Sequence, residues 1–172
     1  MEVSVLTLEQ FNKMLREKYN GDSINLMEKI HYFDYTDLNT LFSSKSYIEH
    51  LRFVVAYNEK DILGICKFSY WDFTKDYAVS YTSTNKDYKN QGVAKSIEKE
   101  LFKYFSKEYP NQILAFSGYS IDGWKYLRKY ILKYSQEFNV KIKEKSIEYV
   151  KEWTDENRKM FDESRKIIKS EY

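Results

Sequence analysis

The sequence predicts a mixed α/β (α+β) domain with a mostly antiparallel central sheet flanked by helices and an extra helix at the C-terminal end. Two strand-like runs, Arg52–Tyr57 and Ile62–Trp71, are followed by a third over residues 77–84. Their connections are too short for a parallel crossover, so the three runs form an antiparallel meander. The third run then passes through a polar turn and Gly92 into a helix. That helix supplies a crossover, so the next strand, residues 112–117, should lie parallel to residues 77–84.

Length and composition indicate one domain without a metal or disulfide scaffold. A chain of 172 residues is ordinarily one domain, so we expect residues 1–172 to form one unit, with residues 154–172 as an appended helix. Lys and Arg number 28 against 26 Asp and Glu, which gives no strong signal for binding nucleic acid or membrane. One cysteine excludes an internal disulfide, and one cysteine with two histidines argues against a metal site. No leader or membrane-spanning run is visible, so a cytoplasmic protein is expected.

The first fifty residues predict one strand followed by helices. Residues 3–6 predict a strand, and Thr7 with Gln10 forms a capping box for a helix. Residues 20–22 predict a turn, and residues 24–50 spread apolar positions over one or two helices and a loop. Such a segment often flanks a substrate cleft. Three side chains here are candidates for its wall or, alternatively, for simple packing: Glu28, Tyr32 and Tyr35.

The central stretch carries the clearest signals for turns. Residues 58–61 are polar and join the first two strands of the meander as a hairpin, and residues 72–76 form a turn into the third. Residues 85–91 are a polar run that cannot continue a buried strand, and Gly92 lets the backbone approach something closely. After it, apolar residues recur at helical spacing opposite a lysine-rich face, and Pro110 ends the helix.

The last third of the chain continues the alternation of strand and helix. Residues 118–123 predict a turn, and residues 124–137 predict a helix with one apolar face. Residues 140–145 and 146–150 alternate in polarity and predict one or two strands. Thr154 then caps a final helix, which packs on its own sheet or meets a partner subunit, so a homodimer is one assembly that we consider.

The turn at Gly92 is suited to binding a phosphate. A polar, glycine-containing turn that enters a helix presents backbone N–H groups beside the positive end of the helix dipole. The sequence of residues 89–94, Lys-Asn-Gln-Gly-Val-Ala, resembles the Gln/Arg-x-x-Gly-x-Gly/Ala loop of the GNAT superfamily of acyl-CoA N-acyltransferases, with Lys at the first position. The aromatic Tyr88 before it and Gly64 early in a hairpin strand also match the family. The order of predicted elements is similar to the GNAT fold over nearly the whole chain.

The resemblance implies that acetyl-CoA is the acyl donor. Its pyrophosphate would meet backbone N–H groups of the loop, and its pantetheine arm would pair with a strand edge much as an added strand does. Two central strands would splay to admit the arm, and a bulge in the first would aim a backbone N–H at the thioester oxygen, where charge grows in the transition state. Ser120 stands where the family has an Asn that contacts CoA. The cofactor-binding residues so implied are Thr82, Ser83, Thr84, Lys89, Asn90, Gln91, Gly92, Val93, Ala94, Lys95 and Ser120.

The resemblance implies a less complete catalytic site. The family often places a Tyr acid within Asn-x-x-Ala-x-x-Phe-Tyr, whereas here Leu127 holds the Tyr position. Tyr126 is adjacent, about a quarter-turn away on a helix, and is the candidate catalytic acid, while Tyr130 lies one turn further along. Both tyrosines are alternatively core or surface aromatics. The candidate bases, acting directly or through water, are Asp76, Tyr81 and Asp122.

Other chemistries have less support. Cys66 lies in an apolar strand, which favours a buried packing residue over a nucleophile. Residues 92–96 end in Lys-Ser like a nucleotide-binding P-loop, but Ala94 stands where that motif requires Gly. Neither a dinucleotide-binding fingerprint nor a Gly-x-Ser-x-Gly nucleophile elbow appears in the sequence.

Three functions remain. The first is an N-acetyltransferase that moves acetyl from acetyl-CoA to an amine of a small-molecule or protein acceptor. The second is the same fold without turnover, as a CoA-binding or protein-interaction module; Leu127 and Ser120 favour it, and the intact loop at residues 89–94 disfavours it. The third is a toxin-like or modifying enzyme acting on a charged tRNA or a protein, which predicts a basic surface beside the cleft, whereas the sequence shows scattered lysines.

Overall fold

The computed structural model describes residues 1–20, 23–31, 33 and 43–171. The expected turn at residues 20–22 and the candidate cleft residues Tyr32 and Tyr35 therefore fall partly or wholly outside the described residues. In chain order the elements are β1 (Glu2–Leu6), α1 (Leu8–Tyr19), α2 (Ser23–Lys29), α3 (Lys45–His50), β2 (Arg52–Tyr57), β3 (Ile62–Trp71), β4 (Asp76–Thr84), the short 3-10 helix η2 (Lys86–Tyr88), α4 (Val93–Glu108), β5 (Ile113–Phe116), β6 (Tyr119–Ser120), the π-helical turn η3 (Gly123–Leu127), α5 (Arg128–Glu137), β7 (Lys141–Lys143), β8 (Ile147–Tyr149) and α6 (Asp155–Glu171).

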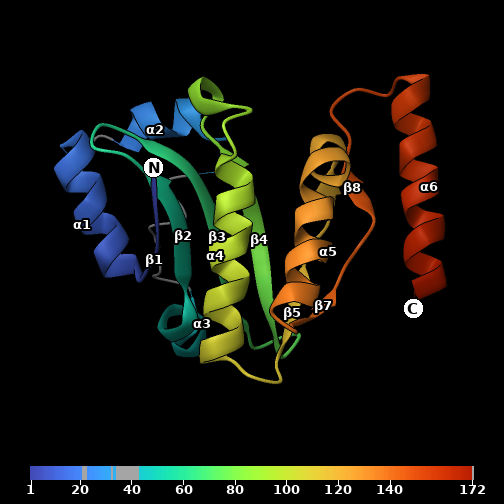
Figure 1. Ribbon diagram of the computed structural model, residues 1–172, viewed down its shortest axis with the longest axis horizontal. Coiled ribbons are helices and arrows are strands. Elements are labelled where there is room, and N and C mark those ends of the chain that lie inside the picture. Colours follow the sequence, from blue (N-terminus) through green and yellow to red (C-terminus); the bar gives the residue numbers. More distant parts are fainter. Residues whose placement is uncertain (21–22, 32, 34–42, 172) are drawn as a thin grey trace.

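The central sheet has six strands in the order β1-β2-β3-β4-β5-β7 (Figure 1). Strands β1 to β4 pair antiparallel, and β4 with β5 and β5 with β7 pair parallel. The predicted meander, the helical crossover and the parallel strand after it are therefore confirmed, as is the mixed, mostly antiparallel fold class. Because α4 joins β4 to β5, it crosses the sheet and packs on β1, β2 and β3.

The sheet separates two apolar cores. One lies on the α4 side and includes Ile97, Leu101 and Phe105, which are fully buried. The other lies under α1 and α2, where the ring of Phe11 stacks on that of Phe53 at a centroid distance of 4.3 Å. Burial of apolar surface on both faces stabilises the sheet.

The N-terminal signals act locally, as predicted. The backbone N–H of Thr7 donates to Gln10 Oε1 at 2.9 Å, and the N–H of Gln10 donates to Thr7 Oγ1 at 3.3 Å. This reciprocal capping box starts α1 directly after β1. At the other end of the chain, the N–H of Asn157 donates to Thr154 Oγ1 at 3.1 Å, which confirms the predicted cap of α6.

The expected turn over residues 118–123 is wrong in part, because Tyr119 and Ser120 form β6 and pair parallel with β8. Gly118 makes this pairing feasible. Its φ is +130°, and a Cβ there would lie 2.5 Å from Glu148 Cγ, so the chain passes β8 too closely for a side chain. The expected helix after residue 123 begins as the π-helical turn η3 before α5 continues.

The C-terminal strands separate, since β7 joins the main sheet and β8 pairs with β6. Of the two arrangements expected for the final helix, the structure has packing on its own chain (Figure 1). The buried Ser164 on α6 accepts a hydrogen bond from the N–H of Ile147 at 3.1 Å, and Met160 and Phe161 contact the larger core. Among the helices described, none is long and apolar enough to cross a membrane.

Candidate functional site

Strands β4 and β5 diverge midway along the sheet. They pair at only three positions, the last being Val79 with Phe116. Beyond that pair, Ser117 Oγ lies 3.4 Å from the carbonyl oxygen of Ser80, and the chain then leaves the sheet at Gly118. The edge of β4 after Val79 thus has no partner strand among the described residues, while its other edge remains paired with β3. This is the splay that the resemblance implies.

A β-bulge lies at the point where the strands separate. On β3, Lys67 is opposite Tyr81 and Phe68 is opposite Val79, so Ser80 is an extra residue of β4 without an opposite residue on β3. A bulge of this kind increases the local twist and redirects backbone groups. The structure therefore has the irregularity that the resemblance implies, on the first of the two splayed strands.

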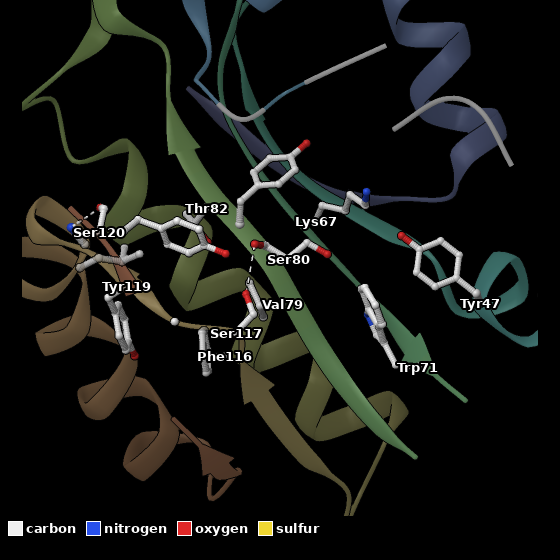
Figure 2. Close-up of a pocket in the computed structure, with 15 residues that line it drawn as sticks. Tyr47, Lys67, Trp71, Val79, Ser80, Thr82, Phe116, Ser117, Tyr119 and Ser120 are labelled. Carbon is white, nitrogen blue, oxygen red and sulfur yellow. Dashed lines mark hydrogen bonds between the residues drawn. The ribbon is translucent and has the colours of Figure 1, made fainter. Parts of the chain in front are cut away.

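A cavity of about 420 Å³ occupies the splay. Figure 2 shows β4 running through it, with Tyr47, Lys67 and Trp71 on one side and the segment from Phe116 to Ser120 on the other. Among the described residues, those that line the cavity are Tyr47, Lys67, Trp71, Val79, Ser80, Tyr81, Thr82, Phe116, Ser117, Gly118, Tyr119, Ser120, Gly123, Leu127 and Tyr149. The cavity thus draws on segments that lie far apart in the sequence.

The loop after β4 forms an open entrance to α4. Gly92 is the N-cap with φ +77°, no side chain caps the helix, and its first turn has no acidic residue. Among the described residues, a Cβ at Gly92 would meet nothing within 4 Å, so this glycine is required by the left-handed backbone and not by close packing. Asn90 also has a positive φ, and residues 89–92 and Lys95 are exposed. The arrangement suits an anion at the helix start.

Hydrogen bonds hold this loop against the β2–β3 hairpin. The buried Asn85 donates from its backbone N–H to the carbonyl of Leu63 at 2.8 Å and from Nδ2 to the carbonyl of Ile62 at 2.9 Å. Tyr88, the aromatic residue before the motif, donates its hydroxyl to Asp61 Oδ2 at 2.7 Å. The polar run therefore has a fixed path from β4 to α4.

Gly64 explains how closely α4 packs on the sheet. A Cβ at Gly64 would lie 2.8 Å from Val93 Cγ1 and 2.9 Å from Ile97 Cδ1. Only a residue without a side chain allows the first turns of α4 to rest on β3 in this way. The glycine thus sets the position of the helix entrance relative to the sheet.

The splayed parallel pair, the bulge on its first strand and the glycine turn into α4 occur together on one sheet with the expected order of elements. This combination is the one that the resemblance to the GNAT acyltransferases implies. The sequence itself matches no protein-family model and no curated protein.

Several solved structures are similar to this chain at a distance. An aminoglycoside acetyltransferase from an uncultured soil metagenomic sample, in complex with trehalose, is 11% identical over 89% of this chain and 96% of its own, with a TM-score of 0.47. A ribosomal-protein-alanine N-acetyltransferase from Brucella melitensis biovar Abortus 2308 is 13% identical over 89% and 99%, with a TM-score of 0.46. An aminoglycoside antibiotic 6'-N-acetyltransferase from Acinetobacter haemolyticus is 10% identical over 90% and 100%, with a TM-score of 0.47.

The residues expected to bind the cofactor fall into two connected groups. Thr82 and Ser120 line the cavity, and Ser120 Oγ also accepts the N–H of Gly123 at 3.0 Å. Ser83 and Thr84 continue the open edge of β4 toward the loop, and residues 89–95 form the loop and the first turn of α4. One strand therefore leads from the cavity to the helix entrance.

The catalytic candidates are distributed differently. The Tyr126 side chain is 54% exposed and does not line the cavity, whereas Leu127 does. Lys125 Nζ lies 5.3 Å from the centre of the Tyr126 ring. Tyr130 is partly buried and packs against the larger core. The role of Tyr126 as the acid thus stays a prediction, and the structure does not bring its ring to the cavity wall.

Among the other candidates, Tyr81 lines the cavity. Asp76 lies at the start of β4 and forms an ion pair with Lys143 at 3.7 Å, and Asp122 precedes η3. Glu28 is exposed on α2. Neither aspartate contributes to the cavity lining, so Tyr81 is the candidate base that the fold places at the cleft.

Sequence reasoning missed most of the lining residues, among them Tyr47, Lys67, Trp71 and Tyr149. Tyr47 comes from α3 and contacts Trp71 edge to face at 5.8 Å between ring centres. Tyr149 comes from β8, which reaches the cleft because it pairs with β6. For Lys67 and Trp71 the alternation of side chains along β3 could have assigned a common face.

Two carboxylates are buried beside the cleft. Glu144 accepts hydrogen bonds from Tyr119 at 2.6 Å and, through both oxygens, from Arg128 at 3.0 Å. Burial, together with the Glu144 charge, raises the pKa of Tyr119 well above its usual value. On α4, the side chain of Glu98 is fully buried and accepts the Thr82 hydroxyl at 2.8 Å.

The thiol of Cys66 is also buried, as predicted, and burial raises its pKa well above its usual value, so it lacks the thiolate character of a nucleophile. In the part of the chain that the structure describes, no group of three or more His, Cys, Asp and Glu side chains could hold a metal ion.

Proposed function

We propose that the protein is an acetyl-CoA-dependent N-acetyltransferase. The observation that carries the proposal is the open edge of β4, which begins at the Ser80 bulge beside the cavity and leads to the uncapped start of α4 at Gly92. A ligand with a diphosphate at one end and an extended, amide-containing arm fits this path. The loop N–H groups of residues 89–95 would bind the diphosphate, and Thr82, Ser83 and Thr84 would pair with the arm.

The reaction needs an unprotonated amine, a donor for the oxyanion and a proton for the departing sulfur. The amine nitrogen attacks the thioester carbon, the C–S bond breaks, and the amine proton passes through solvent or a side chain to the thiolate. Backbone groups redirected by the bulge at Ser80 would stabilise the oxyanion. Positioning two substrates in one cleft contributes to the rate even without a dedicated acid.

The proposal has two candidates for the residue that protonates the departing sulfur. Tyr126 is adjacent to Leu127, which holds the position of the family's Tyr acid, and Tyr149 is one of the tyrosines that line the cavity. Separate Tyr126→Phe and Tyr149→Phe variants distinguish them, because loss of an acid lowers kcat and changes the alkaline limb of its pH profile. If the acid is the one of the two that lines the cavity, we expect the lower kcat and the altered pH profile in Tyr149→Phe. If the acid is the tyrosine next to the matching helix position, we expect them in Tyr126→Phe.

The acceptor is proposed only as an amine, on a small molecule or a protein. Two of the similar structures are aminoglycoside acetyltransferases and one is a ribosomal-protein-alanine N-acetyltransferase. The aromatic side chains of Tyr47, Trp71 and Tyr149 on the cavity wall suit an acceptor with an apolar face. A panel of aminoglycosides and N-terminal peptides, assayed for thiol release from acetyl-CoA, tests these classes together.

The donor site is tested by thermal unfolding with acetyl-CoA and with CoA. A ligand at about 100 times its Kd stabilises the folded state by about 2.7 kcal/mol, which for a chain of this length raises the midpoint by about 5–10 °C. Gly92→Asn should remove most of this shift, because its side chain enters the cradle. The unliganded midpoint should change little, because Asn tolerates a positive φ.

The matched control is Lys75→Asn, which introduces the same residue at another left-handed position, φ 57°, in the exposed β3–β4 turn at the far end of β4. It should keep the full shift. A full shift in Gly92→Asn would refute the proposed donor site.

The absence of Tyr at position 127 specifically favours one rival, a GNAT-fold module that binds CoA without turnover. That rival predicts a thermal shift but no thiol release with any amine.

A further inference from the structure

Glu98 is a buried acid that the proposed reaction does not use. It lies on α4 with no exposed surface, and its Oε1 accepts the Thr82 hydroxyl at 2.8 Å. Its second oxygen, Oε2, is also buried and has no hydrogen-bond partner in the part of the chain that the structure describes. Burying a charged oxygen without a hydrogen-bond partner is costly, so burial favours the protonated form of this carboxyl.

Thr82 belongs to two environments. Its hydroxyl bonds to Glu98, and the same residue lines the cavity on the open edge of β4 (Figure 2). A hydroxyl has one proton to donate and two lone pairs that accept. The protonation state of Glu98 therefore determines whether the Thr82 hydroxyl can donate a hydrogen bond to a ligand or can only accept one.

The two protonation states of Glu98 require opposite directions of the hydrogen bond between Glu98 and Thr82. An ionised carboxylate only accepts, so Thr82 must give it the proton and presents lone pairs alone to the cavity. A protonated Glu98 can donate from Oε1 to Thr82, which satisfies its buried proton and frees the Thr82 proton for the cavity. The direction of one hydrogen bond thus sets the polarity of the cleft wall.

The protonation state of Glu98 changes near physiological pH. Burial raises the pKa of Glu98 to about 7, and the hydrogen bond from Thr82 offsets part of that rise. Two other titratable side chains sense its charge, Cys66 on β3 and Tyr119 on β6. Burial raises the pKa of both well above their usual values, so both stay neutral near pH 7. Of these three side chains, Glu98 is therefore the one whose charge changes near pH 7.

We propose that Glu98 is a positioning residue that sets the hydrogen-bond polarity of Thr82, so that the ionised form makes Thr82 an acceptor for an amide N–H of bound CoA. This inference rests on the proposed function, because CoA is the ligand that brings amides along β4. CoA binding then tightens as the pH rises through about 7.

The test is the Kd of CoA, measured by calorimetry between pH 6 and pH 8 for the wild type, Glu98→Gln and Glu100→Gln. One net hydrogen bond corresponds to about a fivefold change, so the wild-type Kd should fall by about that factor relative to Glu98→Gln. Titration of the ligand's own phosphate is common to all variants and cancels in this comparison. Glu100→Gln removes a partly exposed carboxylate from the same helix and should follow the wild type.

Thr82→Val removes the hydroxyl and should abolish the pH-dependent difference, which gives a second test if Glu98→Gln fails to fold. A wild type that binds CoA with the same pH profile as Glu98→Gln or Thr82→Val overturns the role of Glu98 and leaves the donor site intact. A wild type that binds no CoA at any pH overturns the proposed function instead.

Discussion

The burial of Glu98 predicts an unusual dependence of stability on pH. Its pKa rises from 4.5 to about 7 in the folded chain, so between these values the folded state binds more protons than the unfolded state. The free energy of unfolding therefore falls as the pH increases over this range and levels off above about pH 7. A rise of this size corresponds to roughly 3 kcal/mol of lost stability, because the acid is fully buried and little screened.

Glu98→Gln removes this titration while preserving the volume of the side chain and a hydrogen bond to Thr82. Urea unfolding at intervals from pH 5 to pH 8 gives the free energy of unfolding of both proteins. All other ionisable groups are shared, so the stability of Glu98→Gln minus that of the wild type should rise by roughly 3 kcal/mol across the range. Glu100→Gln, on the exposed side of α4, should run parallel to the wild type.

A constant difference between Glu98→Gln and the wild type would refute the reasoning. It would mean that Glu98 keeps an ordinary pKa in the folded chain, and that water or a movement of α4 reaches Oε2. A difference that grows toward low pH would reverse the sign and show that the folded chain stabilises the ionised form.

Two further changes test the packing around the site. Gly64→Ala brings a Cβ to 2.8 Å from Val93 Cγ1 and 2.9 Å from Ile97 Cδ1, so these side chains or α4 itself must move. Urea unfolding should show a loss of about 1–3 kcal/mol, and wild-type stability would contradict the close packing. Arg128→Met leaves the carboxylate of Glu144, which is 5% exposed, without its bidentate partner, and should lower the free energy of unfolding by about 3–5 kcal/mol in the same assay. The Arg128→Met/Glu144→Met double variant should recover part of this loss, because it leaves no buried charge unpaired. Equal stability of the wild type and the single variant would show that the ion pair contributes nothing.

The fold was predictable where its signals are local. The capping box at Thr7, the polar hairpin turn at residues 58–61 and the break before Gly92 act over a few residues, and each appears where it was expected. The parallel placement of β5 followed from the length of α4, because a helical crossover leaves few alternatives.

The strand β6 was not predictable, because it exists only through pairing with β8, about 28 residues further along the chain. Tyr119 and Ser120 carry no strand pattern of their own, and a two-residue strand is too short for alternation to show. The expected turn was inferred from glycines whose actual function, at Gly118, is to let two segments pass closely.

The candidate acid shows the same limit within a helix. The angular position of Tyr126 was inferred for an α-helix, but Gly123–Leu127 forms a π-helical turn, which changes the direction of successive side chains. The cavity wall is completed by Tyr47 and Tyr149, which come from remote segments. The glycine turn at residues 89–92, in contrast, has a local sequence signal, the left-handed Gly92 directly before α4.

The link between α6 and β8 has a mechanical consequence. Removing α6 would delete no strand, yet the amide of Ile147 would lose the Ser164 oxygen that satisfies it inside the protein. Strand β8 would then be less firmly anchored, and the ring of Tyr149 two residues later would be held less tightly at the rim. Substitutions along a helix that is not part of the cavity lining can therefore alter the cavity wall at Tyr149, and such variation leaves the turn at Gly92 untouched.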